Sequence, residues 1–344
     1  MAGQAVRRCS GTVRAVRDWL VAADDRTGAF EVAGLMAVVV GPVTVTVGTA
    51  PVGNGVVDLG SRAMSAAEAS RWSTVVDEHP SAWTAHKIDS TLRGNWVGEL
   101  LARQAMTGRR VVVLPGWPEL GRTCVDGLVC AHGSPVGRPA DGLPGADSLT
   151  GADALRVWLA GEGRIAVCDV PDSETMHALA LGLTGTDVLI AGPAGPLGAA
   201  FAAHIGAPSV PVSTPPVGDA IVVVCGSANV VSHEQLRRLS MARPDIAVMS
   251  VPTTDGELEP EVATALAERA ARWIAGARPD TVIVIGGDTA AALLRATPRS
   301  VGGFVAPGMP WSRDEGGRGP MVVTKAGGFG GPDVLVELLR GETV

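Results

Sequence analysis

The chain has 344 residues, 46% of them hydrophobic, and its 28 basic and 35 acidic side chains give a formal net charge of −7. This length and composition indicate a globular protein of about two domains, because single hydrophobic cores rarely grow beyond about 250–300 residues. The negative charge and the absence of a Lys/Arg block argue against a nucleic-acid partner, since nonspecific affinity for a phosphate backbone depends on clustered cations.

From the N-terminal part of the sequence we expect neither a signal peptide nor a membrane span. The apolar run at 19–23 is too short for the hydrophobic region of a signal peptide. Residues 32–57 carry no charge, but Pro42 interrupts them and residues 43–47 alternate with period two, which predicts a helix ending near Gly41 followed by a strand. The five cysteines lack metal-ligand spacing, so we expect reduced thiols in a cytoplasmic protein.

Short β-rich runs recur along the chain, and a glycine or proline turn and a helix-like stretch follow each run. Strands that alternate with helices in this way predict parallel α/β sheets. The runs are residues 19–23, 43–47, 111–114, 165–170 and 188–191, and then 221–225, 246–251, 281–285 and 321–324.

The segment 208–218 contains four prolines, which exclude a helix and suit a stiff connector. We therefore predict two Rossmann-like α/β domains with mainly parallel sheets. The first spans residues 1–207, the proline-rich linker spans 208–218, and the second spans 219–344. Ligands of open α/β sheets bind in the loops at the carboxyl ends of the strands, so these loops are the candidate sites.

Lysine is rare in this chain: of the 28 Lys and Arg residues, only Lys87 and Lys325 are lysines. Arginine cannot replace lysine where a compact ammonium on a flexible side chain must contact a single oxygen atom. Both lysines are therefore candidates for contacts with an anion or a phosphate. The alternative is chance survival on a solvated surface.

The first unusual motif is Lys-Ile-Asp-Ser-Thr-Leu-Arg-Gly-Asn at 87–95. Lys87 and Arg93 would clamp a substrate carboxylate, and Asp89 would accept a hydroxyl proton or order the cations, with Ser90 beside it. The alternative interpretation is a helix whose N-cap is Asp89 or Ser90. The two interpretations are compatible.

A second motif, Ala-Ala-Asp-Asp-Arg-Thr-Gly-Ala, covers residues 22–29 directly after the first predicted strand. Two adjacent carboxylates at a strand end favour a polyol or a metal-bound phosphate, and the following helix N-terminus supplies amides for an anion. We assign a ligand role to Asp25, with Asp24 as the alternative helix cap. Ser61-Arg62 follows the 56–59 segment in a similar position.

The second half has glycine-bearing strand ends at 225–227, 285–289 and 324–330. Glycines there allow backbone N–H groups to approach phosphate oxygens, and Asp288-Thr289 is predicted to cap a helix through 290–294. Three such turns at one sheet edge would form a nucleotide cradle, although no P-loop or dinucleotide fingerprint occurs. The candidate nucleotide-binding residues are Ser227, Gly286, Gly287, Asp288, Thr289, Lys325 and Gly327.

Aromatic and imidazole side chains give weaker signals. The chain has no tyrosine, and its eight tryptophans share no spacing, so we interpret them as packing residues, with Trp96 nearest to a candidate site. The six histidines are isolated, and none is assigned a metal role.

These motifs, together with Gly121-Arg122-Thr123 and Pro307-Gly308, follow the order seen in the four-carbon acid sugar kinase family, which the chain resembles over nearly its whole length. The resemblance implies an ATP-dependent kinase that phosphorylates the terminal hydroxyl of a tetronate, such as threonate or erythronate, or of a 3-oxo-tetronate. It implies a sugar acid in the N-terminal domain, ATP in the C-terminal domain and an active site in the cleft between them. The substrate residues carried over are Asp25, Arg62, Lys87, Asp89, Ser90 and Arg93.

The resemblance also implies Mg²⁺ with the ATP, a sugar acid and ATP as partners, and no membrane partner, and it leaves a homodimer open. Two residues depart from the family pattern. Glu31 stands where the family usually has aspartate, and Arg26 replaces a common apolar residue, where its charge would alter substrate choice. The chain is also shorter than typical members between the 226–227 and 286–287 motifs.

Phosphoryl transfer requires alignment of the acceptor hydroxyl and neutralisation of charge. We expect Arg62, with Lys87 or Arg93, to bind the substrate carboxylate, and Asp25 or Asp89 to orient or deprotonate the hydroxyl. The alternatives are a kinase for another hydroxy or oxo sugar acid, and a non-catalytic sugar-acid-binding regulatory protein derived from such a kinase. Either kinase requires the Lys87 and Lys325 segments to face one cleft.

Overall fold

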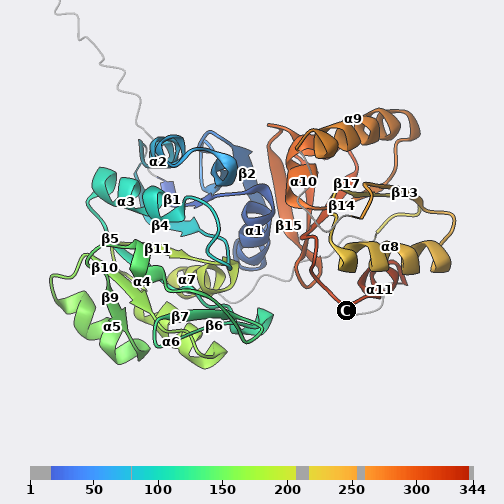
Figure 1. The fold of residues 1–344 in the computed structure, drawn as a ribbon. Helices are drawn as coiled ribbons and strands as arrows, with labels where there is room; N and C mark the ends of the chain where they lie inside the picture. The colour runs from blue at the N-terminus through green and yellow to red at the C-terminus, as the bar shows by residue number, and fades with distance from the viewer. Residues whose placement is uncertain (1–16, 79, 207–216, 254–259, 341–344) are drawn as a thin grey trace, which may run out of the picture.

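The computed structural model describes residues 17–78, 80–206, 217–253 and 260–340, which form two α/β lobes lying side by side (Figure 1). The proline-rich segment predicted at 208–218 lies outside the described residues except for its last two positions. The predicted domain boundaries therefore remain a prediction.

The N-terminal lobe contains the elements from β1 to α7. Its strands are β1 (Arg17–Ala23), β2 (Val43–Val47), β3 (Gly55–Asp58), β4 (Ser81–Lys87), β5 (Arg110–Val113), β6 (Arg122–Val125), β7 (Leu128–Ala131), β8 (Ser134–Gly137), β9 (Asp147–Leu149), β10 (Ile165–Cys168) and β11 (Val188–Gly192). Its helices are α1 (Arg26–Val40), α2 (Ala66–Ser73), α3 (Trp96–Thr107), α4 (Pro139–Gly142), α5 (Gly151–Ala160), α6 (Ser173–Gly182) and α7 (Ala194–Ile205), with 3-10 turns η1 (Ser61–Ala63), η2 (Thr74–Glu78) and η3 (Pro118–Leu120).

The C-terminal lobe contains the elements from β12 to α11. Its strands are β12 (Ile221–Cys225), β13 (Ala247–Ser250), β14 (Thr281–Ile285), β15 (Arg299–Ala306), β16 (Met309–Asp314) and β17 (Met321–Lys325). Its helices are α8 (Val230–Ala242), α9 (Pro260–Ala277), α10 (Gly287–Leu294) and α11 (Val334–Arg340).

The main sheets of the two lobes join into one sheet of 14 strands, in the order β13-β12-β14-β17-β16-β15-β2-β3-β1-β4-β11-β5-β10-β9. All strands from β2 to β9 in this order are parallel, as are β13, β12, β14 and β17. The lobes meet where β15 pairs antiparallel with β2, with Val45 opposite Arg299. The predicted pair of mainly parallel α/β sheets is confirmed.

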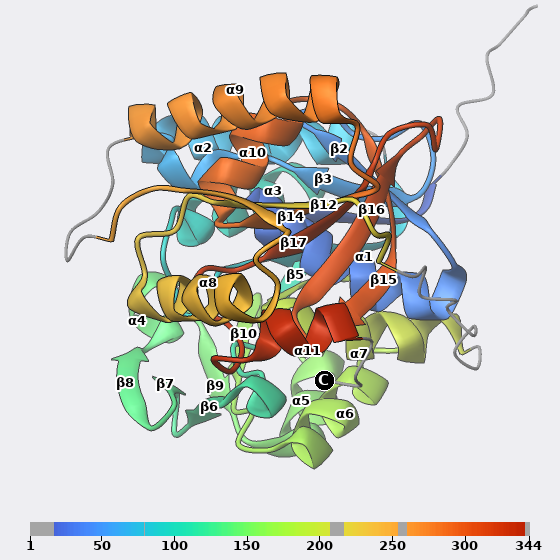
Figure 2. The same cartoon turned by 90° about the vertical axis from the view of Figure 1, so that its right-hand side faces the viewer.

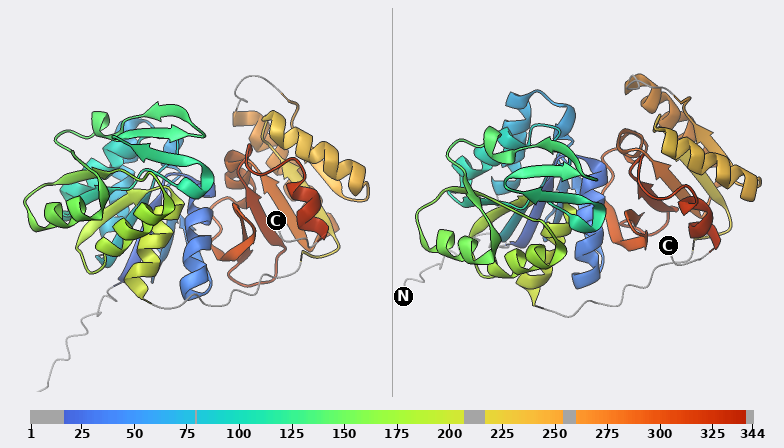
Figure 3. Two further views of the ribbon diagram at one scale, coloured as in Figure 1. Left: turned by 90° about the horizontal axis from the view of Figure 1, so that it is seen from below. Right: turned by 60° about the horizontal axis from the view of Figure 1, so that its bottom comes forward.

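Helices cover both faces of each sheet. In the N-terminal lobe α1, α7, α6 and α5 pack side by side on one face, and α2 and α3 lie on the other (Figure 1). In the C-terminal lobe α9 and α10 lie on one face and α8 and α11 on the other (Figure 2). A separate three-stranded sheet, β6-β7-β8, extends from the N-terminal lobe toward the C-terminal lobe (Figure 3).

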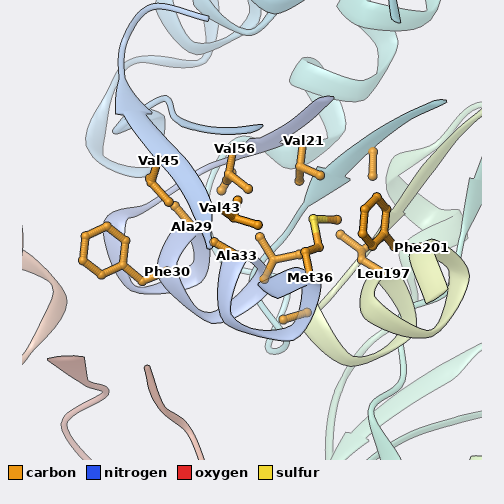
Figure 4. Packing of buried hydrophobic residues seen from close by; sticks show 14 of the residues in the cluster. Val21, Ala29, Phe30, Ala33, Met36, Val43, Val45, Val56, Leu197 and Phe201 are labelled. Atoms are coloured by element: carbon orange, nitrogen blue, oxygen red, sulfur yellow. The ribbon is translucent and has the colours of Figure 1, made fainter. Parts of the chain in front are cut away.

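Helix α1 is fixed by the largest hydrophobic core. It packs between the strands of its own lobe and α7, and it also contacts β15, β16 and α10 of the other lobe. Phe201 of α7 lies edge-on to Trp19 with ring centroids 4.9 Å apart. Full burial of each large apolar side chain contributes about 1.5–3 kcal/mol, so the N-terminus of α1 is held firmly. Figure 4 shows Val21, Ala29, Phe30, Ala33, Met36, Val43, Val45, Val56, Leu197 and Phe201 of this cluster.

The uncharged stretch at 32–57 forms the end of α1 and the strands β2 and β3, as predicted. Gly41 caps α1 with a φ of 81°, in the region that favours glycine. In the part of the chain that the structure describes, no helix combines the length and the apolarity needed to cross a membrane.

Candidate active site between the lobes

The strand registers explain why the predicted motifs meet. Ala23 at the end of β1 lies opposite both Asp58 of β3 and Lys87 of β4. In the second lobe Ile285 at the end of β14 lies opposite Cys225 and Lys325. The loops that follow these strands therefore leave the sheet at one edge in each lobe.

These two sets of loops enclose one cavity of about 440 Å³. The cavity is lined from the N-terminal lobe by Asp25, Arg62, Lys87, Asp89, Ser90 and Arg93, and from the C-terminal lobe by Ser227, Gly286, Gly287, Asp288, Thr289 and Gly327. Every residue predicted for the site lines it except Lys325.

The two lobes approach each other in the cavity at the N-termini of α1 and α10. A methyl group on Gly287 would lie 2.9 Å from Thr27 Oγ1 and 3.4 Å from Asp25 Oδ2. The first residue of α10 therefore lies within van der Waals reach of the predicted substrate residues. Both helix N-termini present backbone amides and a positive dipole end, an arrangement that binds anions.

Arg62 is surrounded by three carboxylates. Its Nη2 lies 2.8 Å from Asp24 Oδ2 and 3.4 Å from Asp89 Oδ1, and its Nη1 lies 3.0 Å from Asp25 Oδ2. Burial alone would lower the pKa of Arg62, but these carboxylates hold that pKa above its ordinary value. Arg62 therefore fixes the acidic side chains in place, while a quarter of its own surface remains exposed to the cavity.

Asp24 lies behind the cavity wall and is fully buried. Burial raises the pKa of its carboxyl to about 6, against the opposing charges of Lys87 and Arg62. The helix cap is not Asp24 but Asp25, whose Oδ1 accepts a hydrogen bond of 2.9 Å from the Gly28 amide.

Asp89 organises a turn and not a helix, so the predicted cap at Asp89 or Ser90 is wrong. Its carboxylate accepts hydrogen bonds from the Arg93 Nε and Nη2 groups, both at 2.9 Å, and from Thr91. Burial would raise the pKa of Asp89, but the Arg93 hydrogen bonds and the Arg62 charge outweigh it and hold this pKa below its ordinary range. The following helix, α3, begins only at Trp96.

Lys87 provides an unpaired cation. It is 4% exposed, and among the described residues its ammonium makes no hydrogen bond or ion pair. A methyl group on Gly28 would lie 2.6 Å from the Lys87 Nζ, so this ammonium packs against the first turn of α1. A cation is unfavourable at the positive end of a helix dipole. The arrangement therefore favours the binding of an anion beside Lys87.

Arg26 does not line the cavity, and the predicted effect of its charge on substrate choice stays a prediction. Its guanidinium forms a buried ion pair with Asp58, and its Nη2 donates to the Arg295 carbonyl oxygen at 2.8 Å. Because Asp58 and Arg295 belong to different lobes, Arg26 joins the lobes below the cavity.

The sequence interpretation missed several cavity residues. Trp117 lines the cavity, whereas Trp96, the tryptophan nearest to a candidate site in the sequence, is a buried packing residue whose Nε1 donates to the Leu92 carbonyl. Arg122 of β6 also lines the cavity, and its Nη1 lies 2.6 Å from His132 Nε2. Glu31 lines the cavity one helical turn after Thr27. Because residues four apart lie on the same face of a helix, this spacing in the sequence could have identified Glu31 as a cavity residue.

The predicted nucleotide side of the cavity is built by close approaches of the backbone at glycines. A methyl group on Gly327 would lie 2.3 Å from Ser227 Oγ, and one on Gly226 would overlap the Thr289 hydroxyl. The cap of α10 is Gly286 with a φ of 109°, so Asp288 and Thr289 lie inside the first turn and do not cap the helix as predicted. Thr289 Oγ1 is buried without a hydrogen-bond partner in the described residues.

Lys325 lies beneath the loop after β17 and not in the cavity. Its Nζ donates 2.9 Å hydrogen bonds to the carbonyls of Ala326 and Gly327. Burial lowers the pKa of this lysine to about 8. Lys325 therefore supports the glycine-rich loop from below and is a positioning residue.

Helix α8 holds the same loop from the side. Gln235 Nε2 lies 3.0 Å from the Phe329 carbonyl, 3.1 Å from that of Gly330 and 2.9 Å from that of Gly331. Ser232 donates its hydroxyl proton to the Gly327 carbonyl, and its Oγ lies 3.2 Å from Ser227 Oγ. No local sequence pattern pointed to these contacts, because they join segments far apart in the chain.

Comparison with known proteins agrees with a sugar-binding lobe and a nucleotide-binding lobe. Residues 19–142 match the family model of a sugar-binding N-terminal domain, and residues 252–335 match that of a nucleotide-binding C-terminal domain. These two domains together cover more than half of the chain. The chain belongs to the four-carbon acid sugar kinase family.

A curated relative is the D-threonate kinase of Cupriavidus necator, which is 31% identical over 209 residues. The alignment covers 49% of this chain and 50% of the relative, so the match spans about half of that kinase.

Two solved structures share the fold. A Haemophilus influenzae protein aligns with a TM-score of 0.69 at 20% identity, covering 94% of this chain and 100% of its own. A Salmonella typhimurium LT2 protein named as a putative tRNA synthase aligns with a TM-score of 0.73 at 19% identity, covering 94% and 99%.

Proposed function

We propose that this protein is an ATP-dependent kinase that phosphorylates the terminal hydroxyl of a four-carbon sugar acid, a tetronate or a 3-oxo-tetronate. The observation that carries the proposal is the approach of Gly287 in the nucleotide lobe to Thr27 and Asp25 in the sugar lobe, within one 440 Å³ cavity. The D-threonate kinase relative supports the same class of substrate.

The acid's carboxylate binds the unpaired ammonium of Lys87. Arg93 adds a second cation, because its side chain is 67% exposed while it holds Asp89. Arg62 acts mainly as the organiser of Asp24, Asp25 and Asp89, since its donors already contact these three carboxylates. A small acid held in this way leaves its far hydroxyl toward the nucleotide lobe.

The triphosphate binds at the N-terminus of α10 and over the glycine turns at 226–227 and 286–287. Glycine at these positions lets the turns pack closely together, because a methyl group on Gly226 would overlap the Thr289 hydroxyl, and the dipole of α10 favours the charge of the phosphates.

Magnesium would accompany the nucleotide. The described residues contain no cluster of three or more His, Cys, Asp or Glu side chains that could hold a metal by itself. Mg²⁺ in phosphoryl-transfer sites commonly uses one or two carboxylates together with phosphates and water. Asp288 and the partnerless Thr289 hydroxyl fit this donor set, and the ion would neutralise charge on the phosphates.

The test is ADP release from ATP·Mg²⁺ across a panel of tetronates, 3-oxo-tetronates and related hydroxy acids. We expect ADP formation that depends on one of the four-carbon acids and that falls strongly in the Lys87→Met variant. Absence of acid-dependent ADP across the panel would refute the proposal. Thermal stabilisation by the acids but not by ATP·Mg²⁺ would favour a sugar-acid-binding protein instead.

A further inference from the structure

The four carboxylates that line the cavity differ in their partners. Asp25 uses Oδ1 for the Gly28 amide and Oδ2 for Arg62. Asp89 accepts hydrogen bonds from Arg93 and Thr91 and forms an ion pair with Arg62. A carboxylate that accepts several such hydrogen bonds is a weak proton acceptor, because they stabilise its charged form.

The two remaining carboxylates belong to different lobes. Asp288 is exposed at the start of α10, on the nucleotide side. Glu31 is half-buried on α1, and among the described residues its side chain has no hydrogen bond or ion pair. In the sugar lobe, Glu31 is therefore the cavity carboxylate whose oxygens are free to meet a ligand.

The position of Glu31 follows from the helix period. Residues 27, 28 and 31 share one face of α1, and all three line the cavity. Lys87, Asp25, Asp89 and Arg122 are the charged groups with the largest effects on Glu31. Glu31 thus lines the cavity that holds the predicted substrate residues, within electrostatic reach of the unpaired ammonium.

We propose that Glu31 is the catalytic base of the phosphoryl transfer. This inference rests on the proposed function. The hydroxyl O–H bond of the acid breaks and its proton moves to a Glu31 oxygen, while the hydroxyl oxygen forms a bond to the γ-phosphorus of ATP. The bond from that phosphorus to the bridging oxygen breaks, and its electron pair leaves on ADP. Glu31 then returns the proton to solvent.

The electrostatics of the site suit this role. Burial raises the pKa of Glu31 to about 7, and Asp25 and Asp89 also raise it, whereas Lys87 and Arg122 lower it. A base that titrates near the working pH transfers protons most effectively. The elements packed against α1 also carry Asp58, His204, Asp288, Arg299, Arg313, Asp314 and Lys325, and none of these is among the main causes of the raised pKa of Glu31.

The experiment compares Glu31→Gln and Glu31→Asp with the wild type on the acid that gives ADP release. Glu119→Gln is the control, because it removes the same charge from an exposed residue that does not line the cavity. The measurements are kcat and KM for the acid as a function of pH, with thermal unfolding to verify folding.

We expect Glu31→Gln to lower kcat by about 10²–10⁴-fold, the usual contribution of one general base, with little change in KM. The wild-type rate should rise with pH through about 7 as Glu31 loses its proton, and this rise should vanish in Glu31→Gln. Glu31→Asp should keep the rise with a reduced kcat, and Glu119→Gln should match the wild type.

A folded Glu31→Gln enzyme that keeps the wild-type kcat, or that keeps the rise near pH 7, overturns the role of Glu31 and leaves the kinase assignment standing. A wild-type protein without acid-dependent ADP release overturns both.

Discussion

Replacing Gly28 by alanine tests whether the position of Lys87 matters more for activity than for stability. The new methyl group would lie 2.6 Å from Lys87 Nζ, 3.2 Å from Lys87 Cε and 2.7 Å from Asp25 Oδ1. Favourable contacts of carbon with heavy atoms begin at about 3.5 Å, so the ammonium and the carboxylate must each move by roughly 1 Å.

The effects of this substitution on folding nearly cancel. Alanine in place of glycine in a helix is favourable by about 0.5–1 kcal/mol. Disturbing the hydrogen bond from the Gly28 amide to the Asp25 cap costs about 0.5–2 kcal/mol. We expect the free energy of unfolding to fall by at most about 1.5 kcal/mol, because the long Lys87 side chain can move aside.

The effect on catalysis should be much larger. A displacement of about 1 Å in a positioned group costs on the order of 10²-fold in rate, so kcat/KM for the acid should fall by about that factor. The assay is ADP release together with urea unfolding. The control is Gly276→Ala in α9, where a methyl group meets nothing within 4 Å and activity should not change. Wild-type kcat/KM in a folded Gly28→Ala enzyme would refute the assignment of Lys87.

Two further substitutions test buried cations. In the wild type, burial holds the pKa of Lys325 near 8 in the folded state, against 10.5 in the unfolded state, so the folded state binds fewer protons between these pH values. The free energy of unfolding of the wild type should therefore increase by on the order of 3 kcal/mol as the pH rises through this interval. The Lys325→Met variant should lack this increase. Denaturant unfolding on either side of the interval measures the gain, and an equal slope in the variant would contradict it. In Arg26→Met, Asp58 loses its buried partner, so unfolding should become easier by about 3–5 kcal/mol while the preference among acids stays unchanged. An altered preference among the acids would support a role for Arg26 in substrate choice.

The parallel strands were readable from sequence because buried strands are compact β-branched runs. Residues 43–47, 221–225 and 281–285 form strands at the predicted bounds. Strand β4 escaped detection, although it carries Lys87, because Ser-Ala-Trp-Thr-Ala-His-Lys has no such run. The antiparallel strands β15 and β16 were missed as well, since register shifts interrupt their pairing.

Many residues of the cavity were predictable from the sequence, but their contacts with one another were not. The motif at 87–95 identified Asp89, yet its role depends on Arg62, which arrives from another loop. Lys325 was expected to contact phosphate, whereas the fold turns its ammonium beneath the loop. Such differences arise because contacts between distant segments depend on strand register and lobe packing, which local patterns do not encode.

The antiparallel pairing of β2 with β15 has a consequence for the newly made protein. Synthesis proceeds from the N-terminus, so residues 43–47 are available long before residues 299–306 exist. Until then one side of the uncharged Val-Thr-Val-Thr-Val strand is an open edge, which is a template for pairing with other chains. Pairing with β15 of the C-terminal lobe therefore also protects the N-terminal lobe from aggregation. A nascent chain that stalls before β15 is made leaves the edge of β2 exposed to pairing with other chains.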